Sequence, residues 1–342
     1  MGIKAFIAGC SATALTDEEK EFFRAENPWG YILFARNIDN PDQVRDLVGQ
    51  MRECAGRADA PVLIDQEGGR VQRLRPPHWP SYPTGRTLGD IYRKDADKGL
   101  RAAWLQSRLI AFDLSALGIN VDCLPVLDTP VEGAHDVIGD RAYSFRPYEV
   151  AQMGRAACDG LFAGGVLPVI KHIPGHGRAC ADSHLELPIV DEHPAILGCT
   201  DFYPFMQLAD MPLAMTAHVV YSGFDAQNPA TSSRRLVDEI IRGWLGFEGL
   251  LMSDDLSMQA LSGDFSYRTQ SAFAAGCDVV LHCNGNMGEM REIAANTPEL
   301  DGEAAHRAFL ALDRLVSWQR DAQEDEAALR DEFAQLLAWN RA

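Results

Sequence analysis

The sequence of 342 residues predicts an α/β fold, a (β/α)8 TIM-type barrel with a helical C-terminal extension. Three observations predict it: short apolar runs rich in β-branched residues recur, helical patterns separate them, and the runs are almost continuously apolar, as in strands covered on both faces. Eight β/α units fit the roughly 250 residues that such a barrel needs. The runs lie at residues 5–8, 31–34, 62–65, 120–125, 167–171, 213–218, 250–253 and 279–282.

The first run has a competing interpretation. Ile7-Ala8-Gly9-Cys10 behind Lys4 is similar to the cleavage box of a bacterial lipoprotein signal. The apolar stretch before the cysteine is only about five residues long, whereas a secretory apolar region needs about 7 to 15. We therefore expect a first β-strand over residues 4–10 and no targeting segment. Because no apolar run approaches the ~20 residues of a membrane span, we expect a cytoplasmic protein without a membrane partner.

Amphipathic stretches lie between the runs, and residues 39–56 are a clear example. Asn40 is a typical helix-capping residue, and Pro41 suits the first turn of a helix. Val44, Leu47 and Met51 follow at helical spacing, so that one face is apolar. The stretch predicts a helix that covers the barrel.

The C-terminal part is also helical in pattern. From Gly302 onward one apolar stripe contains Phe309, Leu312, Leu315 and Val316. We expect a terminal pair of helices, packed on the barrel and solvated on one face. Since no linker or second composition class interrupts the chain, the sequence predicts one domain over residues 1–342, with the barrel at about 3–290 and the terminal helices at about 302–340.

The charge and the cysteines exclude some classes of protein. A formal net charge of −18 and a pI near 4.8 argue against nucleic-acid binding, since no basic stripe is present to neutralise phosphates.

The eight cysteines form no C-x-x-C pair. We expect them to be reduced and mostly buried, as in a cytoplasmic protein. Nothing implies an obligate protein partner.

Polar residues follow five of the runs, at the ends that would form the active face of a barrel. A cap or an ion pair would explain any one of them, but five together favour a functional site. These ends carry residues 65–73 (DQEGGRVQR), Asp128 with 139–141 (GDR), Lys171-His172, His218, and Asp254-Asp255.

The segment KHIPGHGRACADSHLELP, residues 171–188, allows three interpretations. For a metal site, His172 and His176 are four apart, but Pro174 between them disfavours the helix that would align them. For a phosphate site, the glycine-rich turn opening a helix is missing. Asp182 and His184 are two apart, so both side chains point the same way in an extended chain. We favour a loop in which the aspartate orients a histidine for acid–base chemistry.

The run at 250–253 ends in two aspartates, and two uses compete for them. A carboxylate at the mouth of the barrel is a candidate nucleophile. Asp254 or Asp255 is equally suited to cap the following helix. The sequence alone leaves open which residue does which.

Taken together, the motifs KHIPGHG-x4-DSH-x-x-LP, DQEGGRVQR, GDRAYS and SDDLSM resemble those of family-3 glycoside hydrolases, specifically the bacterial single-domain β-N-acetylglucosaminidases that recycle cell-wall fragments. The resemblance covers residues 3 to about 290 with the motifs in the family's order. It implies a single glycoside hydrolase domain and a retaining, two-step mechanism without metal or organic cofactor. The implied substrate is a small carbohydrate, an N-acetylglucosamine-terminated muropeptide.

The resemblance also implies roles for individual residues. Asp254 is the expected nucleophile, and His184, oriented by Asp182, the expected acid and base. This departs from the usual pair of carboxylates in retaining enzymes. The residues expected to hydrogen-bond the sugar hydroxyls are Asp65, Arg73, Arg141, Lys171 and His172. The acetamide pocket is unassigned, and Arg178 is a candidate contact for an anionic aglycone.

Four alternatives stay open at this point. A histidine acid/base does not repel phosphate, so a phosphorylase that forms the sugar 1-phosphate is one. A plain β-glucosidase without acetamide preference is the second. The others are a non-catalytic amino-sugar or muropeptide-binding protein and a metal-dependent hydrolase.

Overall fold

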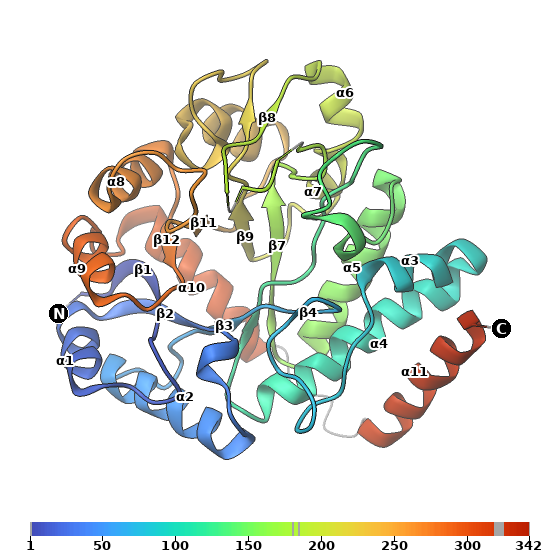
Figure 1. The fold of residues 1–342 in the computed structure, drawn as a ribbon, viewed down its shortest axis with the longest axis horizontal. Helices are drawn as coiled ribbons and strands as arrows, with labels where there is room; N and C mark the ends of the chain where they lie inside the picture. The colour runs from blue at the N-terminus through green and yellow to red at the C-terminus, as the bar shows by residue number, and fades with distance from the viewer. Residues whose placement is uncertain (1, 180, 184, 318–324, 342) are drawn as a thin grey trace.

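The computed structural model describes residues 2–179, 181–183, 185–317 and 325–341, and contains a closed barrel of eight parallel strands (Figure 1). Around the barrel the strand order is β1-β12-β11-β9-β7-β6-β3-β2. All eight predicted runs contribute a strand, so the predicted barrel is confirmed. The strands are β1 (Lys4–Gly9), β2 (Pro28–Leu33), β3 (Val62–Ile64), β6 (Val121–Asp122), β7 (Leu167–Ile173), β9 (Leu213–Thr216), β11 (Leu250–Asp255) and β12 (Val279–His282).

A ring of helices surrounds the strands (Figure 1). The long connections are those that parallel neighbours require. The helices are α1 (Asp17–Glu26), α2 (Pro41–Ala55), α3 (Gly85–Lys94), α4 (Ala96–Ser115), α5 (Pro147–Ala163), α6 (Pro194–Cys199), α7 (Tyr203–Gln207), a helical segment at Leu236–Trp244, α8 (Phe265–Ala275) and α9 (Met287–Ala295). Two small sheets stand apart from the barrel, pairing β4 (Gln66–Gly68) with β5 (Val71–Gln72) and β8 (Ile189–Val190) with β10 (Val220–Tyr221).

The predicted helix at 39–56 shows how the local sequence sets an element. The Asn40 side chain accepts hydrogen bonds from the backbone N–H groups of Asp42 and Gln43, both at 3.1 Å, which caps the helix. Gly56 ends it with a φ of 62°, a left-handed conformation that favours glycine. Val44, Leu47 and Met51 are fully buried. The predicted helix and its apolar face are confirmed.

The C-terminal helices α10 (Gly302–Ser317) and α11 (Glu326–Arg341) both pack on the rest of the chain. Arg307 of α10 pairs with Asp278, directly before β12, so α10 lies at the N-terminal end of the barrel. In Figure 1, α11 lies outside the ring, beside α4, and the carboxylate of Glu332 holds Arg101 of α4 at 2.7 and 2.8 Å. The single domain over residues 1–342 stays a prediction.

One detail of the C-terminal prediction is wrong. Phe309 does not lie on the packed stripe of α10, because its side chain is 64% exposed. Ala308 and Ala311 are buried instead, and Leu312 and Leu315 are partly buried against the core. The small side chains of Ala308 and Ala311 allow this face of α10 to pack closely on the barrel. Phe309 therefore lies on the solvent side of the helix.

The seven described cysteines are free thiols, and all but Cys199 are buried, close to expectation. Within the described ranges, no helix combines the length and the apolar character needed to cross a membrane.

Candidate active site

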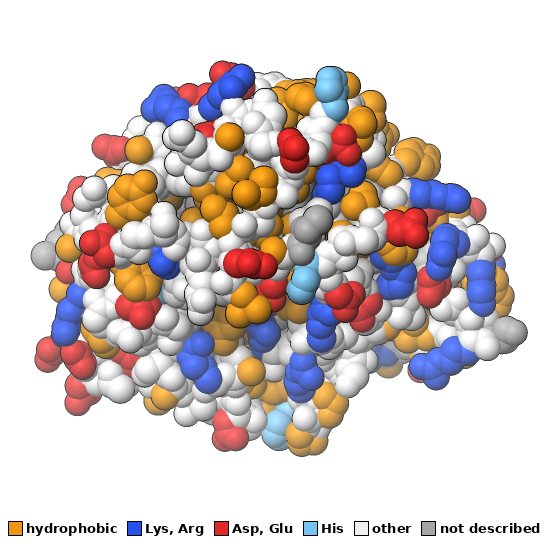
Figure 2. Space-filling view, turned by 45° about the horizontal axis from the view of Figure 1, so that its top comes forward, with side chains coloured by type: hydrophobic (Ala, Val, Ile, Leu, Met, Phe, Trp, Pro, Cys, Tyr) orange, Lys and Arg blue, Asp and Glu red, His pale blue; other side chains and the backbone are white. Residues whose placement is uncertain are grey.

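A cavity of about 330 Å³ opens at the C-terminal ends of the barrel strands. Figure 2 is turned so that the end toward which β7 points in Figure 1 comes forward, and acidic, basic and imidazole side chains lie there among apolar ones. Most of the remaining wall is apolar and includes Ile32, Phe34, Met215, Met258, Leu281 and Cys283. Six of the eight predicted site residues line the cavity: Asp65, Arg73, Arg141, Lys171, His172 and Asp254.

Two glycines shape the segment that follows β3. Gly68 and Gly69 have φ angles of 99° and 59°, which β-branched or bulky residues rarely adopt. They turn the chain between β4 and β5, so that Arg73 returns beside Asp65, with Nη2 and Oδ2 3.0 Å apart. The two glycines in DQEGGRVQR therefore bring the ends of this motif together at the cavity.

Lys171 is the centre of an ion-pair floor, which we define as Asp65, Glu67, Arg73, Arg141 and Lys171. Its Nζ lies 2.8 Å from Asp65 Oδ1 and 2.7 Å from Glu67 Oε1, and its side chain is only 2% exposed. Arg141 donates to both oxygens of Glu67, from Nε and Nη2, each at 2.8 Å. Three cations and two carboxylates thus share one surface, most buried at Lys171 and Glu67, with one positive charge in excess.

The floor keeps its charges at neutral pH. Burial alone raises the pKa of Asp65, but Lys171 and Arg73 outweigh it and hold that pKa well below the usual range. Burial is likewise outweighed at Glu67, where Arg141 and Lys171 lower the pKa to about 2. For Lys171, burial acts to lower the pKa, and the two carboxylates raise it more strongly. The floor therefore presents fixed ionic donors and acceptors, which form stronger and more directional hydrogen bonds than neutral groups.

His172 is oriented by a buried carboxylate. Its Nδ1 lies 2.6 Å from Asp128 Oδ2, and Asp128 is fully buried. Burial raises the pKa of Asp128, but His172 and His176 together lower it below its ordinary value, so it is ionised. A carboxylate beside Nδ1 favours a proton on that nitrogen, which leaves Nε2 for a ligand.

The two aspartates at the end of β11 differ in what they bind. The carboxylate of Asp255 accepts the backbone N–H of Ser257 at 3.0 Å, the Ser257 hydroxyl at 2.5 Å and the N–H of Cys283 at 3.2 Å. Asp255 therefore stabilises the turn after β11. The prediction that Asp254 or Asp255 caps the following helix is wrong, because Asp264 caps α8. Both aspartates line the cavity, and an oxygen of the Asp254 carboxylate accepts the backbone N–H of Asp255, at 2.8 Å.

His218 follows β9, but its ring is bound by neighbouring protein groups and has a structural role. Its Nδ1 lies 2.7 Å from the Thr231 hydroxyl, and its Nε2 lies 3.0 Å from the carbonyl oxygen of Asp255. The ring is fully buried, and this burial lowers its pKa. The expectation that His218 points into the mouth is wrong; it fixes the backbone at the end of β11 instead.

The predicted proton-transfer pair lies in the loop after β7. His184 is outside the described residues. Asp182 is half-buried, and its carbonyl accepts the N–H groups of Leu185 at 2.9 Å and Glu186 at 3.0 Å, so the chain turns tightly there. Arg178 of the same loop binds Asp201 at 3.0 Å and Glu192 at 3.2 Å.

Within the described part of the chain, no group of three or more histidine, cysteine or acidic side chains is arranged to hold a metal ion. His172 and His176 instead share Asp128: the ring of His172 and the backbone N–H of His176 both bind its carboxylate.

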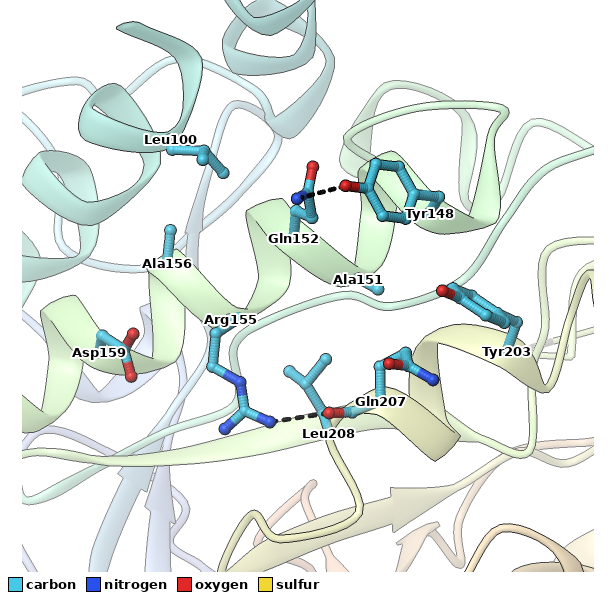
Figure 3. A pocket seen from close by; sticks show the side chains of 10 residues that line it. All are labelled: Leu100, Tyr148, Ala151, Gln152, Arg155, Ala156, Asp159, Tyr203, Gln207 and Leu208. Carbon is cyan, nitrogen blue, oxygen red and sulfur yellow. Dashed lines mark hydrogen bonds between the residues drawn. The ribbon is translucent and has the colours of Figure 1, made fainter. Parts of the chain in front are cut away.

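A second hollow, of about 450 Å³, lies outside the barrel between α4, α5 and α7. Figure 3 shows Tyr148, Gln152 and Arg155 projecting from α5, with Tyr203 and Gln207 on α7 beside them. Its polar groups bind one another: Arg155 donates to the Gln207 carbonyl at 2.7 Å, and Gln152 donates to the Tyr148 hydroxyl at 2.8 Å. The hollow offers no nucleophile beside an acid, so the barrel mouth is the candidate site.

Neither Glu67 nor Asp128 was predicted to have a role in the site. Glu67 lies two residues after Asp65 in an extended segment, so both point to one side, and this spacing was a usable signal. Asp128 was recognised only as a polar residue after the fourth run. Its pairing with His172, 44 positions further along the chain, depends on the neighbouring positions of β6 and β7 in the barrel.

Comparisons with known proteins identify relatives of this chain. Residues 7–307 match the family described as Glycosyl hydrolase family 3 N terminal domain. A beta-hexosaminidase of Bordetella avium is 41% identical over 276 residues, which is 79% of this chain and 77% of that protein. One from Idiomarina loihiensis is 37% identical over 334 residues, covering 96% and 97%. NagZ from Neisseria gonorrhoeae, solved with N-trifluoroacetyl-D-glucosamine, is 32% identical with a TM-score of 0.87, covering 98% of this chain and 99% of that one.

Proposed function

Because the chain belongs to glycosyl hydrolase family 3, we propose that it is a retaining exo-β-N-acetylglucosaminidase that removes terminal β-linked N-acetylglucosamine from muropeptides. The predicted family and the β-N-acetylhexosaminidase class are confirmed by the family match and by the curated relatives. The retaining mechanism, the muropeptide substrate and the role in cell-wall recycling are our proposal. The cytoplasmic location stays a prediction.

One observation carries the proposal: Asp254 lines the same cavity as His172 and four residues of the ion-pair floor, Asp65, Arg73, Arg141 and Lys171. The floor matches a sugar ring, since Asp65 is able to accept from hydroxyl groups while Arg73, Arg141 and Lys171 donate to them. The bound sugar would present its anomeric carbon to Asp254 at the end of β11. Asp255, engaged by its turn, is the less suitable nucleophile.

In the first proposed step, an oxygen of Asp254 forms a bond to the anomeric carbon while the bond to the leaving oxygen breaks. His184, oriented by Asp182, gives its proton to that leaving oxygen. In the second step, His184 takes a proton from water, whose oxygen attacks the anomeric carbon and releases Asp254. Two inversions give net retention, and the proton that leaves with the aglycone is replaced on His184 by one from the attacking water.

The choice of an N-acetyl sugar has separate support. The NagZ structure was solved with an N-acylated glucosamine derivative, and its chain matches this one over nearly its whole length. Apolar side chains form much of the remaining cavity wall and would surround an acyl methyl group. The muropeptide aglycone rests on the family resemblance of the motifs.

Substrate preference and stereochemistry test the proposal. We expect the protein to release nitrophenol from p-nitrophenyl N-acetyl-β-glucosaminide and not from p-nitrophenyl β-glucoside. The first product seen by proton NMR should be the β-anomer of N-acetylglucosamine, and in phosphate buffer no sugar 1-phosphate should form. Equal turnover of both glycosides would refute the amino-sugar assignment. An α-anomer as the first product would refute retention, and a sugar 1-phosphate would identify a phosphorylase.

A further inference from the structure

Asp128 links His172 in the cavity wall to the loop after β7. One carboxylate oxygen binds Nδ1 of His172, which lines the cavity. The other accepts the backbone N–H of His176 at 2.6 Å, inside the loop. Asp128 has no exposed surface. A single buried carboxylate therefore fixes both a sugar-facing imidazole and the start of the loop.

The loop is packed tightly at this point. Gly177 lies against Thr129, whose carbonyl oxygen would be only 2.2 Å from a Cβ added at position 177. The hydroxyl of Tyr221 donates to the carbonyl of Gly175. His176 is thus held from several sides, and its side-chain position is set by its neighbours.

His176 in turn holds the far end of the loop. Its Nε2 lies 3.0 Å from the hydroxyl oxygen of Ser183, and both residues are 3% exposed. The carbonyl of Ser183 also accepts the N–H of Ala260, at 3.2 Å, from the segment that follows β11. Burial lowers the pKa of His176 to about 4, with a smaller contribution from His172, so the ring is neutral at pH 7. A neutral imidazole and a hydroxyl form a hydrogen bond in either tautomer.

Ser183 stands between Asp182 and His184, the pair to which the proposed function gives proton transfer. We propose that Asp128, His176 and Ser183 form a loop clasp that positions Asp182, and that this supports the transfer of a proton to the leaving group. The three are positioning residues, since none of them lines the cavity. The inference rests on the proposed function, because it assigns the clasp to the acid step of that reaction.

A purely structural hydrogen bond would behave differently from a positioning one. Loss of a structural bond lowers stability and slows all substrates equally. Loss of a positioning bond weakens acid assistance, so it slows substrates with poor leaving groups most, since good leaving groups need little protonation. Dependence on the leaving group therefore separates the two roles.

The test compares Ser183→Ala with wild type on 2,4-dinitrophenyl and phenyl N-acetyl-β-glucosaminides. We expect kcat/KM to fall less than about threefold for the dinitrophenyl substrate and about 10- to 100-fold for the phenyl substrate, part of the factor that acid catalysis supplies. Ser183→Thr, which keeps the hydroxyl, should restore most of the phenyl activity. In a His184→Ala background, Ser183→Ala should add little further loss, because both changes act on one step. Equal losses with both substrates, or fully additive losses, would overturn the inference.

Ser233→Ala is the matched control, because Ser233 is also a buried serine that binds a side chain, Asp225, and a backbone N–H, that of Leu236. It should show no dependence on the leaving group.

A second readout does not require activity. In hydrogen exchange, Ser183→Ala should speed exchange of the amides of Leu185 and Glu186, which bond to the Asp182 carbonyl, and Ser233→Ala should not. Unchanged exchange in Ser183→Ala would overturn the clasp. A wild type inert on both substrates would refute the proposed function, and with it the assignment of the clasp to the acid step, whatever the exchange shows.

Discussion

Glu67 holds Arg141 by two hydrogen bonds of 2.8 Å each, one from Nε and one from Nη2, and its side chain is only 4% exposed. The same carboxylate binds Nζ of Lys171 at 2.7 Å. Two residues predicted to bind the sugar are therefore aligned by a third that the sequence left without a role. The direction in which the two cations point depends on Glu67 as well as on their own backbone segments, β7 for Lys171 and the short 3-10 helix Gly139–Arg141 for Arg141.

The first prediction concerns this carboxylate. Glu67→Gln should raise KM for p-nitrophenyl N-acetyl-β-glucosaminide about tenfold or more, because Arg141 and Lys171 lose the charge that orients them. It should also lower the free energy of unfolding by about 3 kcal/mol, since buried cations lose a partner. Steady-state kinetics and urea unfolding measure the two effects. Glu149→Gln removes another buried carboxylate, bound to Ser144 and Arg146, and should leave KM unchanged.

The second prediction separates the two aspartates of β11. Asp254→Asn should lower kcat by about 10³-fold or more, because an amide does not form the glycosyl ester. Asp255→Asn should lose about 1 kcal/mol of stability through its weakened turn bonds and retain far more activity. The comparison requires kcat and thermal unfolding for both variants. A larger loss of kcat in Asp255→Asn would exchange the proposed roles.

The third prediction concerns the approach of α3 to the segment that carries Arg141. A Cβ added at Gly85 would lie 2.2 Å from the carbonyl oxygen of Arg141, so Gly85→Ala must displace that backbone. We expect a raised KM and lower stability. Gly49 is the control, because it lies inside α2 with nothing within 4 Å of an added Cβ. Gly49→Ala should raise stability by about 1 kcal/mol through helix propensity, without any change in KM.

The fourth prediction is a dependence of stability on pH. The pKa of His176 is about 4 in the folded chain and about 6.5 in an unfolded one. Between these values the unfolded chain binds the extra proton, so this group's contribution to stability is present above about pH 6.5 and is lost as the pH falls toward 4. The full loss is about 3 kcal/mol. Urea midpoints at several pH values should therefore fall less steeply in His176→Gln than in wild type over this window, and identical slopes would contradict the assignment.

The barrel was predictable because each strand has a local signal. Continuous apolar runs such as residues 250–253 mark strands covered on both faces, and all eight runs became barrel strands. The capped helix at 39–56 was predictable for the same reason, since Asn40 and Gly56 act within a few residues of their own positions. In α10 the buried face depends on what the helix meets, and the large side chain of Phe309 was a misleading signal.

The site was predictable in its residue types and less so in its pairings. Strand ends converge in any parallel barrel, so the convergence of Asp65, Lys171 and Asp254 follows from the fold. The bonds from Glu67 to Arg141, from Asp128 to His172 and from His176 to Ser183 depend on loop conformation. His218 shows that a polar residue at a strand end need not belong to the site, because its ring binds the backbone of the neighbouring strand instead.

Trapping of the covalent intermediate tests the central claim most directly. A 5-fluoro glycosyl fluoride of N-acetylglucosamine, which slows both steps, would be incubated with the protein before digestion and mass spectrometry of the peptides. We expect one added sugar, on the peptide that contains Asp254, and none in Asp254→Asn. A sugar attached to another residue, or turnover of the reagent with no adduct and an inverted product, would contradict it.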